Sequence, residues 1–249
     1  LEQALRRLAV DLVGDEHPLF TQREPRRVAT LVIAGDRGLC GGFNTNILRA
    51  ANQHLADQSD REHVLFAMGK RAILKLRRGP HDLAKTYTDV FEKLSYVLAG
   101  DVCDQLVRLY GESEEKRIDE AYVVYNEFVT TMSQRPRVRK ILPVDYTRLA
   151  AKEAEEAEET EGPRPFYEVE PTTESALARL VGRLLATQVQ QATLESRAAE
   201  LAARMTAMDN ATSNAEDMIR DLTMDYNRAR QAGITAELMD IVGGANALE

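Results

Sequence analysis

The C-terminal third of the chain carries a long and regular series of apolar positions. Residues 174–246 contain no proline, and apolar side chains return along them at alternating steps of three and four residues. An average step of about 3.5 residues is the period of a left-handed coiled coil, so the pattern predicts one long helix with an apolar seam. The seam positions are Leu177, Leu180, Leu184, Thr187, Gln191, Leu194, Ala198, Leu201, Met205, Met208, Thr212, Ala215, Ile219, Leu222, Tyr226, Ala229, Gly233 and Ala236.

Fourteen of these eighteen seam positions are apolar, and the exceptions are Thr187, Gln191, Thr212 and Gly233. A helix over residues 172–249 would be roughly 110 Å long, several times the width of a small domain. We expect a second helix to cover the seam, because no other predicted element of the chain is long enough to do so.

Strand and helix patterns alternate through residues 24–147. The predicted strands are residues 27–34, 63–68, 81–88, 119–130 and 138–144, and the predicted helices are residues 44–57, 70–78 and 95–110. The last strand is expected at a sheet edge, because Pro136 and Pro143 bracket it and proline interrupts strand pairing. The alternation predicts an α/β fold: a Rossmann-like, mostly parallel sheet domain, followed by the very long C-terminal helix.

Two further segments flank this domain. Residues 1–14 have the amphipathic pattern of a helix end and no N-cap, so we expect the earlier part of a coiled-coil helix to belong upstream. Residues 148–171 are predicted to be an acidic linker, because six glutamates and two prolines fall between positions 151 and 165. The long helix then occupies residues 172–249.

A glycine-rich turn follows the first predicted strand and precedes a helix. Its glycines and charged residues are Gly35, Asp36, Arg37, Gly38, Gly41 and Gly42. A doubly wound fold places its phosphate-binding turn at this point, but the spacing does not fit the GxGxxG motif. The Walker pattern is also missing, since Gly69-Lys70 is followed by Arg71 and no partner glycine precedes it. We therefore favour a structural turn over a nucleotide site.

Composition narrows the function classes. The formal net charge of -8 argues against a general nucleic-acid-binding protein. The sequence contains no run of eighteen apolar residues, so we expect no direct membrane insertion. The four histidines are scattered, and Cys40 and Cys103 lack the spacing of a zinc site. We predict no catalytic residues, no metal and no cofactor. Basic clusters at residues 23–27, 70–78 and 135–140 are interpreted as solvated faces or contacts to an acidic protein.

Two segments resemble the gamma subunit of the F-type (rotary) ATP synthase. They are GDRGLCGGFNTN at residues 35–46 and the run from ARMTAMDNAT to IVGGANAL at residues 203–248. The stretch FYEVEP at residues 166–171 also resembles the part of that family that enters the last helix. The resemblance extends over nearly the whole chain and is weakest between residues 62 and 165.

This resemblance implies a central rotor shaft and not an enzyme in its own right. In the family, the long C-terminal helix pairs with an antiparallel N-terminal helix inside a hexamer of alpha and beta subunits. The α/β domain lies beside the epsilon subunit and on the membrane ring of c subunits. Rotation of that ring is coupled to ATP synthesis or hydrolysis at the beta-subunit sites. The implied location is peripheral, on the cytoplasmic face of a bacterial inner membrane, or on the matrix or stroma side in an organelle.

The resemblance also assigns roles to individual positions. The positions that match contacts to the beta subunits are Arg230, Gln231, Thr235 and Glu237. The positions that match the tip held in an apolar bearing are Ile241, Val242, Gly243, Gly244, Ala245 and Leu248. The positions that match a foot facing the c ring and epsilon are Tyr167 and Glu170. At Gly233 and Ala236 the chain departs from the usual family residues, which puts one polar contact in question.

Two other function classes fit part of the pattern. A coiled-coil adaptor or scaffold with an α/β head domain would explain the seam, but not the uncharged C-terminal tip. A nucleotide-binding α/β enzyme would explain the sheet, but the incomplete phosphate turn disfavours it.

Overall fold

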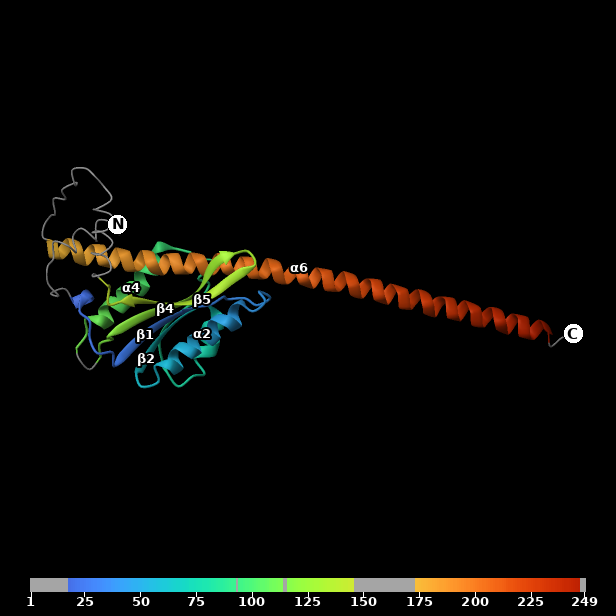
Figure 1. The fold of residues 1–249 in the computed structure, drawn as a ribbon, viewed down its shortest axis with the longest axis horizontal. Helices are drawn as coiled ribbons and strands as arrows, with labels where there is room; N and C mark the ends of the chain where they lie inside the picture. Colours follow the sequence, from blue (N-terminus) through green and yellow to red (C-terminus); the bar gives the residue numbers. More distant parts are fainter. Residues whose placement is uncertain (1–17, 93, 114–115, 146–172, 247–249) are drawn as a thin grey trace, which may run out of the picture. The chain divides into compact units, whose positions relative to one another are not determined.

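The computed structural model describes residues 18–92, 94–113, 116–145 and 173–246 (Figure 1). The predicted helix end at residues 1–14 and the linker and foot at residues 148–171 lie outside these ranges, and so do Tyr167 and Glu170. The chain divides into two units, Leu1–Arg204 and Met205–Glu249, which are described separately below.

A five-stranded sheet forms the centre of the first unit. The strand order is β3-β2-β1-β4-β5, and β1 pairs in parallel with both β2 and β4. Strand β3 is also parallel, whereas β5 is antiparallel to β4. The strands are β1 (Arg27–Ile33), β2 (Glu62–Met68), β3 (Asp82–Tyr87), β4 (Glu120–Thr130) and β5 (Ser133–Leu142). The predicted mostly parallel sheet, followed by a long C-terminal helix, is confirmed.

Helices cover both faces of the sheet (Figure 1). The helices are η1 (Pro18–Phe20), α2 (Phe43–Asp57), α3 (Lys70–Leu76), α4 (Tyr96–Tyr110) and α6 (Thr173–Asn246). One face of β1, formed by Ala29, Leu31 and Ile33, shares an apolar core with α4 and α6. The opposite face, with Val32 at its centre, packs against α2 and α3. The alternating side chains of a strand buried on both sides produce these two cores.

The first half of α6 packs on the sheet through a row of residues. The apolar periodicity of the sequence did not predict this row. Successive steps of three or four residues place all of this row on one face of the helix. The row consists of Val181, Leu185, Val189, Ala192, Ser196 and Ala199, and each is buried. Its later members are small, which lets the helix backbone approach the sheet closely.

No other described element is long enough to cover the whole apolar seam, but the α/β domain covers its first turns. Leu184 is buried in the core of the α/β domain, and Leu180 is partly buried against it. Further along the same seam, Leu194 and Leu201 are 47% and 49% exposed. The domain therefore covers the beginning of the seam, and described residues leave the rest accessible.

The predicted limits of the last strand also need correction. Strand β5 begins at Ser133, five residues before the predicted start, and Pro136 lies inside it opposite Asn126. Proline has no backbone N–H and cannot donate to a neighbouring strand. It is tolerated here because β5 is an edge strand, which has a partner strand on one side only. The short connection from Thr130 to Ser133 makes β4 and β5 a hairpin.

Replacing Leu185 with alanine tests which face of α6 packs on the sheet. Leu185 is 1% exposed, so Leu185→Ala is expected to lower the free energy of unfolding by about 2–5 kcal/mol through lost burial and a cavity. Leu194→Ala is the matched control, because this leucine of the same helix is half exposed and its loss should cost below about 1 kcal/mol. Urea denaturation followed by circular dichroism measures both values. Equal losses in the two variants would contradict the packing described here.

Candidate functional site

The glycine-rich turn lies where open α/β sheets usually bind ligands. It follows β1 at the carboxyl edge of the sheet, beside the point where the strand order reverses between β1 and β4. The turn is held by its own polar groups: the N–H of Gly35 donates to Asn44 Oδ1 at 2.9 Å, and Asn44 Nδ2 donates to the carbonyl of Arg37 at 3.0 Å. One carboxylate oxygen of Asp36 accepts the backbone N–H groups of Lys70 and Asp89.

Helix α6 places a buried carboxylate against this turn. Glu200 is 2% exposed and forms ion pairs with Arg197 and Arg204 of the same helix. Arg204 also donates to the carbonyl of Gly38 at 3.4 Å, and a Cβ added to Gly35 would lie 3.5 Å from Glu200 Oε1. Arg204 and Glu200 of α6 therefore contact the turn itself, and the N–H of Gly35 is already bound by Asn44. Because the chain's own groups occupy these positions, the geometry favours a structural turn over a nucleotide site.

Gly69 and Lys70 lie beside the turn without completing a phosphate site. Gly69 has a φ of 91°, and a Cβ at this position would lie only 2.0 Å from the carbonyl oxygen of Ala34. Glycine is therefore required for close approach of two backbones. Lys70 Nζ pairs with Asp89 at 2.8 Å, which holds this amine away from the role of a phosphate-binding lysine.

The histidines of the described residues pack against other aromatic rings. The structure brings His63 and His81 together, with ring centroids 5.2 Å apart, and packs His54 against Tyr122. Burial lowers the pKa of both His54 and His81. Neither contact could be predicted from the sequence, because the paired residues lie far apart along the chain. Among the described residues, no group of three or more potential ligands could hold a metal ion.

Cys40 and Cys103 are both buried. Burial raises the pKa of the Cys40 thiol, and burial raises the pKa of Cys103 to about 12. A thiol with a raised pKa is mostly protonated near neutral pH and is a poor nucleophile.

The thiol pKa values predict slow reaction with a disulfide reagent. At pH 8 we expect neither Cys40 nor Cys103 of the folded protein to react with 5,5′-dithiobis(2-nitrobenzoate) within minutes, because both are buried and protonated. In denaturing urea both thiols should react rapidly, as their pKa values return to the range of about 8.5. Absorbance of the released thiolate measures the rate. Rapid reaction of either cysteine in the native protein would show that its site is accessible and ionised.

The second unit exposes an unusual amount of apolar surface. From Met208 to Gly244 every side chain of α6 is exposed. The exposed large apolar side chains of this unit are Met205, Met208, Met218, Ile219, Leu222, Met224, Tyr226, Ile234, Leu238, Met239, Ile241 and Val242. A helix of a soluble protein rarely leaves so many large apolar groups uncovered, so this surface is a candidate interface.

The positions singled out from the resemblance lie on this exposed helix. Arg230, Gln231, Thr235 and Glu237 are all exposed, and the Thr235 hydroxyl donates to the backbone carbonyl of Gln231 at 2.8 Å. Neither Arg230 nor Glu237 forms an ion pair within the described parts of the chain. At the tip, Ile241, Val242, Gly243 and Gly244 are exposed, whereas the side chains of Ala245 and Leu248 lie outside the description. No helix in the described ranges has the length and apolarity needed to cross a bilayer.

Comparison with known proteins supplies a context for this helix. The family described as ATP synthase matches residues 1–248. The ATP synthase gamma chain of Pelotomaculum thermopropionicum is 42% identical over 249 residues, which cover all of this chain and 83% of that relative. The gamma chain of Mycobacterium marinum is 38% identical over 263 aligned residues, again with 100% of this chain and 83% of the relative covered.

Solved structures share the fold at lower sequence identity. A chain of the mitochondrial ATP synthase of Euglena gracilis, solved with OSCP, F1 and the c ring, has a TM-score of 0.62 at 20% identity, with 98% of this chain and 85% of that chain covered. A chain from the central stalk and c ring of the Tetrahymena thermophila mitochondrial enzyme has a TM-score of 0.59, also at 20% identity, with 85% and 99% covered. These likenesses support the same architecture, an α/β domain with a long helix.

Proposed function

The chain belongs to the gamma chain family of the ATP synthase, and from this premise we propose that it is the central rotor shaft of a proton-driven ATP synthase. In this role it couples rotation of the membrane c ring to ATP synthesis or hydrolysis at the beta-subunit sites. The gamma chains that match over the whole of this sequence support the assignment. The central stalk and rotor assemblies named for the structural neighbours agree with it.

The exposed apolar surface of α6 is the observation that carries the proposal. Leu222 and Tyr226 are 62% and 67% exposed, and they occur on a helix of 74 residues. Such surface is stable in water when a partner covers it, since each large apolar side chain contributes about 1.5–3 kcal/mol on burial. A second, antiparallel helix along the seam and a surrounding ring of alpha and beta subunits would supply that cover.

We propose that this subunit carries out no bond chemistry itself. The buried Glu200 at the glycine-rich turn and the raised pKa values of the two thiols support a mechanical role. The chemistry of the complex would then occur at the beta subunits. The shaft contributes by presenting different side chains to each of them as it turns.

Contacts at the two ends of the shaft complete the proposal. Near the C-terminal end of α6, the beta subunits would be contacted through hydrogen bonds and ion pairs by Arg230, Gln231, Thr235 and Glu237. The slim, uncharged tip, which begins with Ile241 and Val242, would turn in an apolar bearing. At the foot, Tyr167 and Glu170 would face the c ring and epsilon. The subunit would be peripheral, on the cytoplasmic face of a bacterial membrane.

Co-assembly and coupling test this function together. The full-length subunit, expressed with alpha and beta subunits, should co-purify as part of their hexamer and support rotation-coupled ATP turnover. In membrane vesicles that carry the complete enzyme, Arg230→Ala with Glu237→Ala should lower proton-driven ATP synthesis by about 3- to 10-fold, as expected for the loss of one or two polar contacts. Assembly should remain intact, because both side chains are exposed.

A double variant of the α/β domain provides the control. Arg77→Ala with Glu112→Ala removes the same two residue types from exposed positions outside the shaft helix and should leave synthesis unchanged. Failure of the full-length subunit to co-purify with the hexamer would refute the rotor assignment. Normal ATP synthesis in the Arg230→Ala, Glu237→Ala enzyme would refute the proposed beta-subunit contacts alone.

A further inference from the structure

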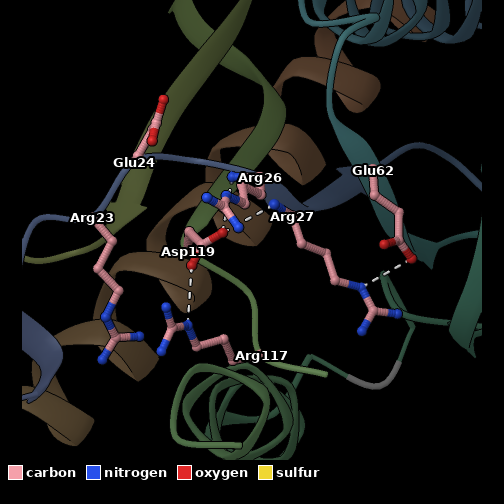
Figure 2. A pocket seen from close by; sticks show the side chains of 7 residues that line it. All are labelled: Arg23, Glu24, Arg26, Arg27, Glu62, Arg117 and Asp119. Carbon is pink, nitrogen blue, oxygen red and sulfur yellow. Dashed lines mark hydrogen bonds and ion pairs between the residues drawn. The ribbon is translucent and has the colours of Figure 1, made fainter. Parts of the chain in front are cut away.

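Four arginines line a pocket at the amino ends of the parallel strands, at the edge of the sheet opposite the glycine-rich turn (Figure 2). The pocket has a volume of about 290 Å³. Its lining residues come from the segment leading into β1, from the start of β2 and from the segment before β4. They are Arg23, Glu24, Arg26, Arg27, Glu62, Arg117 and Asp119, so every one carries a charge.

The buried carboxylate of Asp119 forms the base of this arginine pocket. Its side chain is 6% exposed and accepts the backbone N–H groups of Arg26 and Arg27 at 2.9 and 3.0 Å, together with Arg117 Nε at 3.4 Å. Glu62 is engaged as well, since it pairs with Arg27 Nε at 3.1 Å. These two acids therefore fix the backbone and two of the arginines, and they leave Arg23 and Arg26 without a carboxylate partner among the described residues.

Arg23 is held in place while most of its donors stay available. Its Nη1 donates to the carbonyl of Tyr110 at 3.3 Å, and its guanidinium carbon lies 4.8 Å from the centre of the Tyr110 ring. Tyr110 is itself buried and donates its hydroxyl to the carbonyl of Thr21 at 2.8 Å. Figure 2 shows the guanidinium groups of Arg23 and Arg117 pointing into the same space below Asp119. A guanidinium fixed in this way loses little entropy when it binds an anion.

We propose that this pocket binds a small anion bearing a phosphate or diphosphate group, with Arg23 and Arg26 as the principal ligands. The four arginines and three acids of the described lining leave one net positive charge, which an oxyanion would neutralise. Arginine matches phosphate oxygens through paired N–H donors, and a phosphate placed between two guanidinium groups would separate their like charges. The volume exceeds that needed for a single carboxylate and lies near the lower end of small-ligand pockets.

The lining also indicates how the ligand is recognised. Among the described residues that line the pocket none is aromatic or aliphatic, so these residues offer a base or an acyl chain no apolar surface to stack on. Recognition must come from charge and hydrogen bonds to the phosphate itself. A soluble phosphate or diphosphate and the phosphate headgroup of a lipid share this chemistry. The site is independent of the proposed rotor function and would stand if that assignment failed.

Titration of inorganic pyrophosphate into the chain, followed by isothermal calorimetry at low ionic strength, tests the site. We expect saturable binding that weakens about tenfold or more in Arg23→Gln with Arg26→Gln, because two charged hydrogen-bond donors are lost. Arg77→Gln with Arg78→Gln removes two exposed arginines elsewhere and should bind like the wild type. Arg26→Gln alone shows whether weaker binding comes from unfolding, since the Arg26 side chain is exposed and forms no hydrogen bond with described residues. Its melting temperature should be unchanged and its affinity reduced.

A vesicle arm distinguishes the two sources of phosphate. The chain is floated with vesicles of phosphatidylcholine that contain phosphatidic acid, and vesicles of phosphatidylcholine alone are the control. Binding to the phosphatidic acid vesicles that is lost in Arg23→Gln with Arg26→Gln identifies a lipid headgroup as the ligand. Pyrophosphate binding without vesicle binding identifies a soluble ligand, and either result supports the site. The proposal is overturned if pyrophosphate does not bind saturably or if the double variant binds it equally well.

Discussion

The packing of the first half of α6 on the sheet is the constraint on which the rest of the structure depends. Val181, Leu185 and Val189 fill the core that the sheet shares with α4, and smaller residues follow them along the same face. Because one face is committed to the sheet, the apolar seam beyond Leu184 is turned away from this core and stays exposed. A helix with two apolar faces has to satisfy two partners, and the α/β domain supplies only one.

The same packing satisfies polar groups at the carboxyl edge of the sheet. Strand β1 pairs with β4 only as far as Val124, so the N–H of Asn126 lies beyond the last pairing with β1. Ser196 Oγ accepts this N–H at 3.1 Å, which prevents the cost of an unpaired buried donor. One turn further, Glu200 with its two arginines closes the glycine-rich turn. The edge at which many α/β proteins bind a nucleotide is therefore occupied by the chain's own helix.

Local patterns were sufficient to predict the sheet and the long helix, because both depend on regular periodicities. The start of β5 could not be predicted from local pattern, because proline usually marks the end of a strand and only the tertiary position of an edge strand permits Pro136 inside it. The sheet-facing row of α6 was missed because its later members, such as Ala192 and Ser196, are too small or polar to mark a core. The arginine pocket could be anticipated only as a basic cluster at residues 23–27. Its geometry depends on Asp119, which lies about ninety positions away in the sequence.

Cysteine labelling along α6 tests most directly whether the exposed seam is an interface. Met208 lies on the seam, and Asn210 lies two residues further, about 200° around the helix. The reaction of Met208→Cys and Asn210→Cys with a maleimide can be compared in the chain alone and in the chain assembled with alpha and beta subunits. We predict rapid labelling of both positions in the chain alone, and protection of position 208 by about tenfold or more relative to position 210 after assembly. Equal labelling of position 208 in both states would contradict the account.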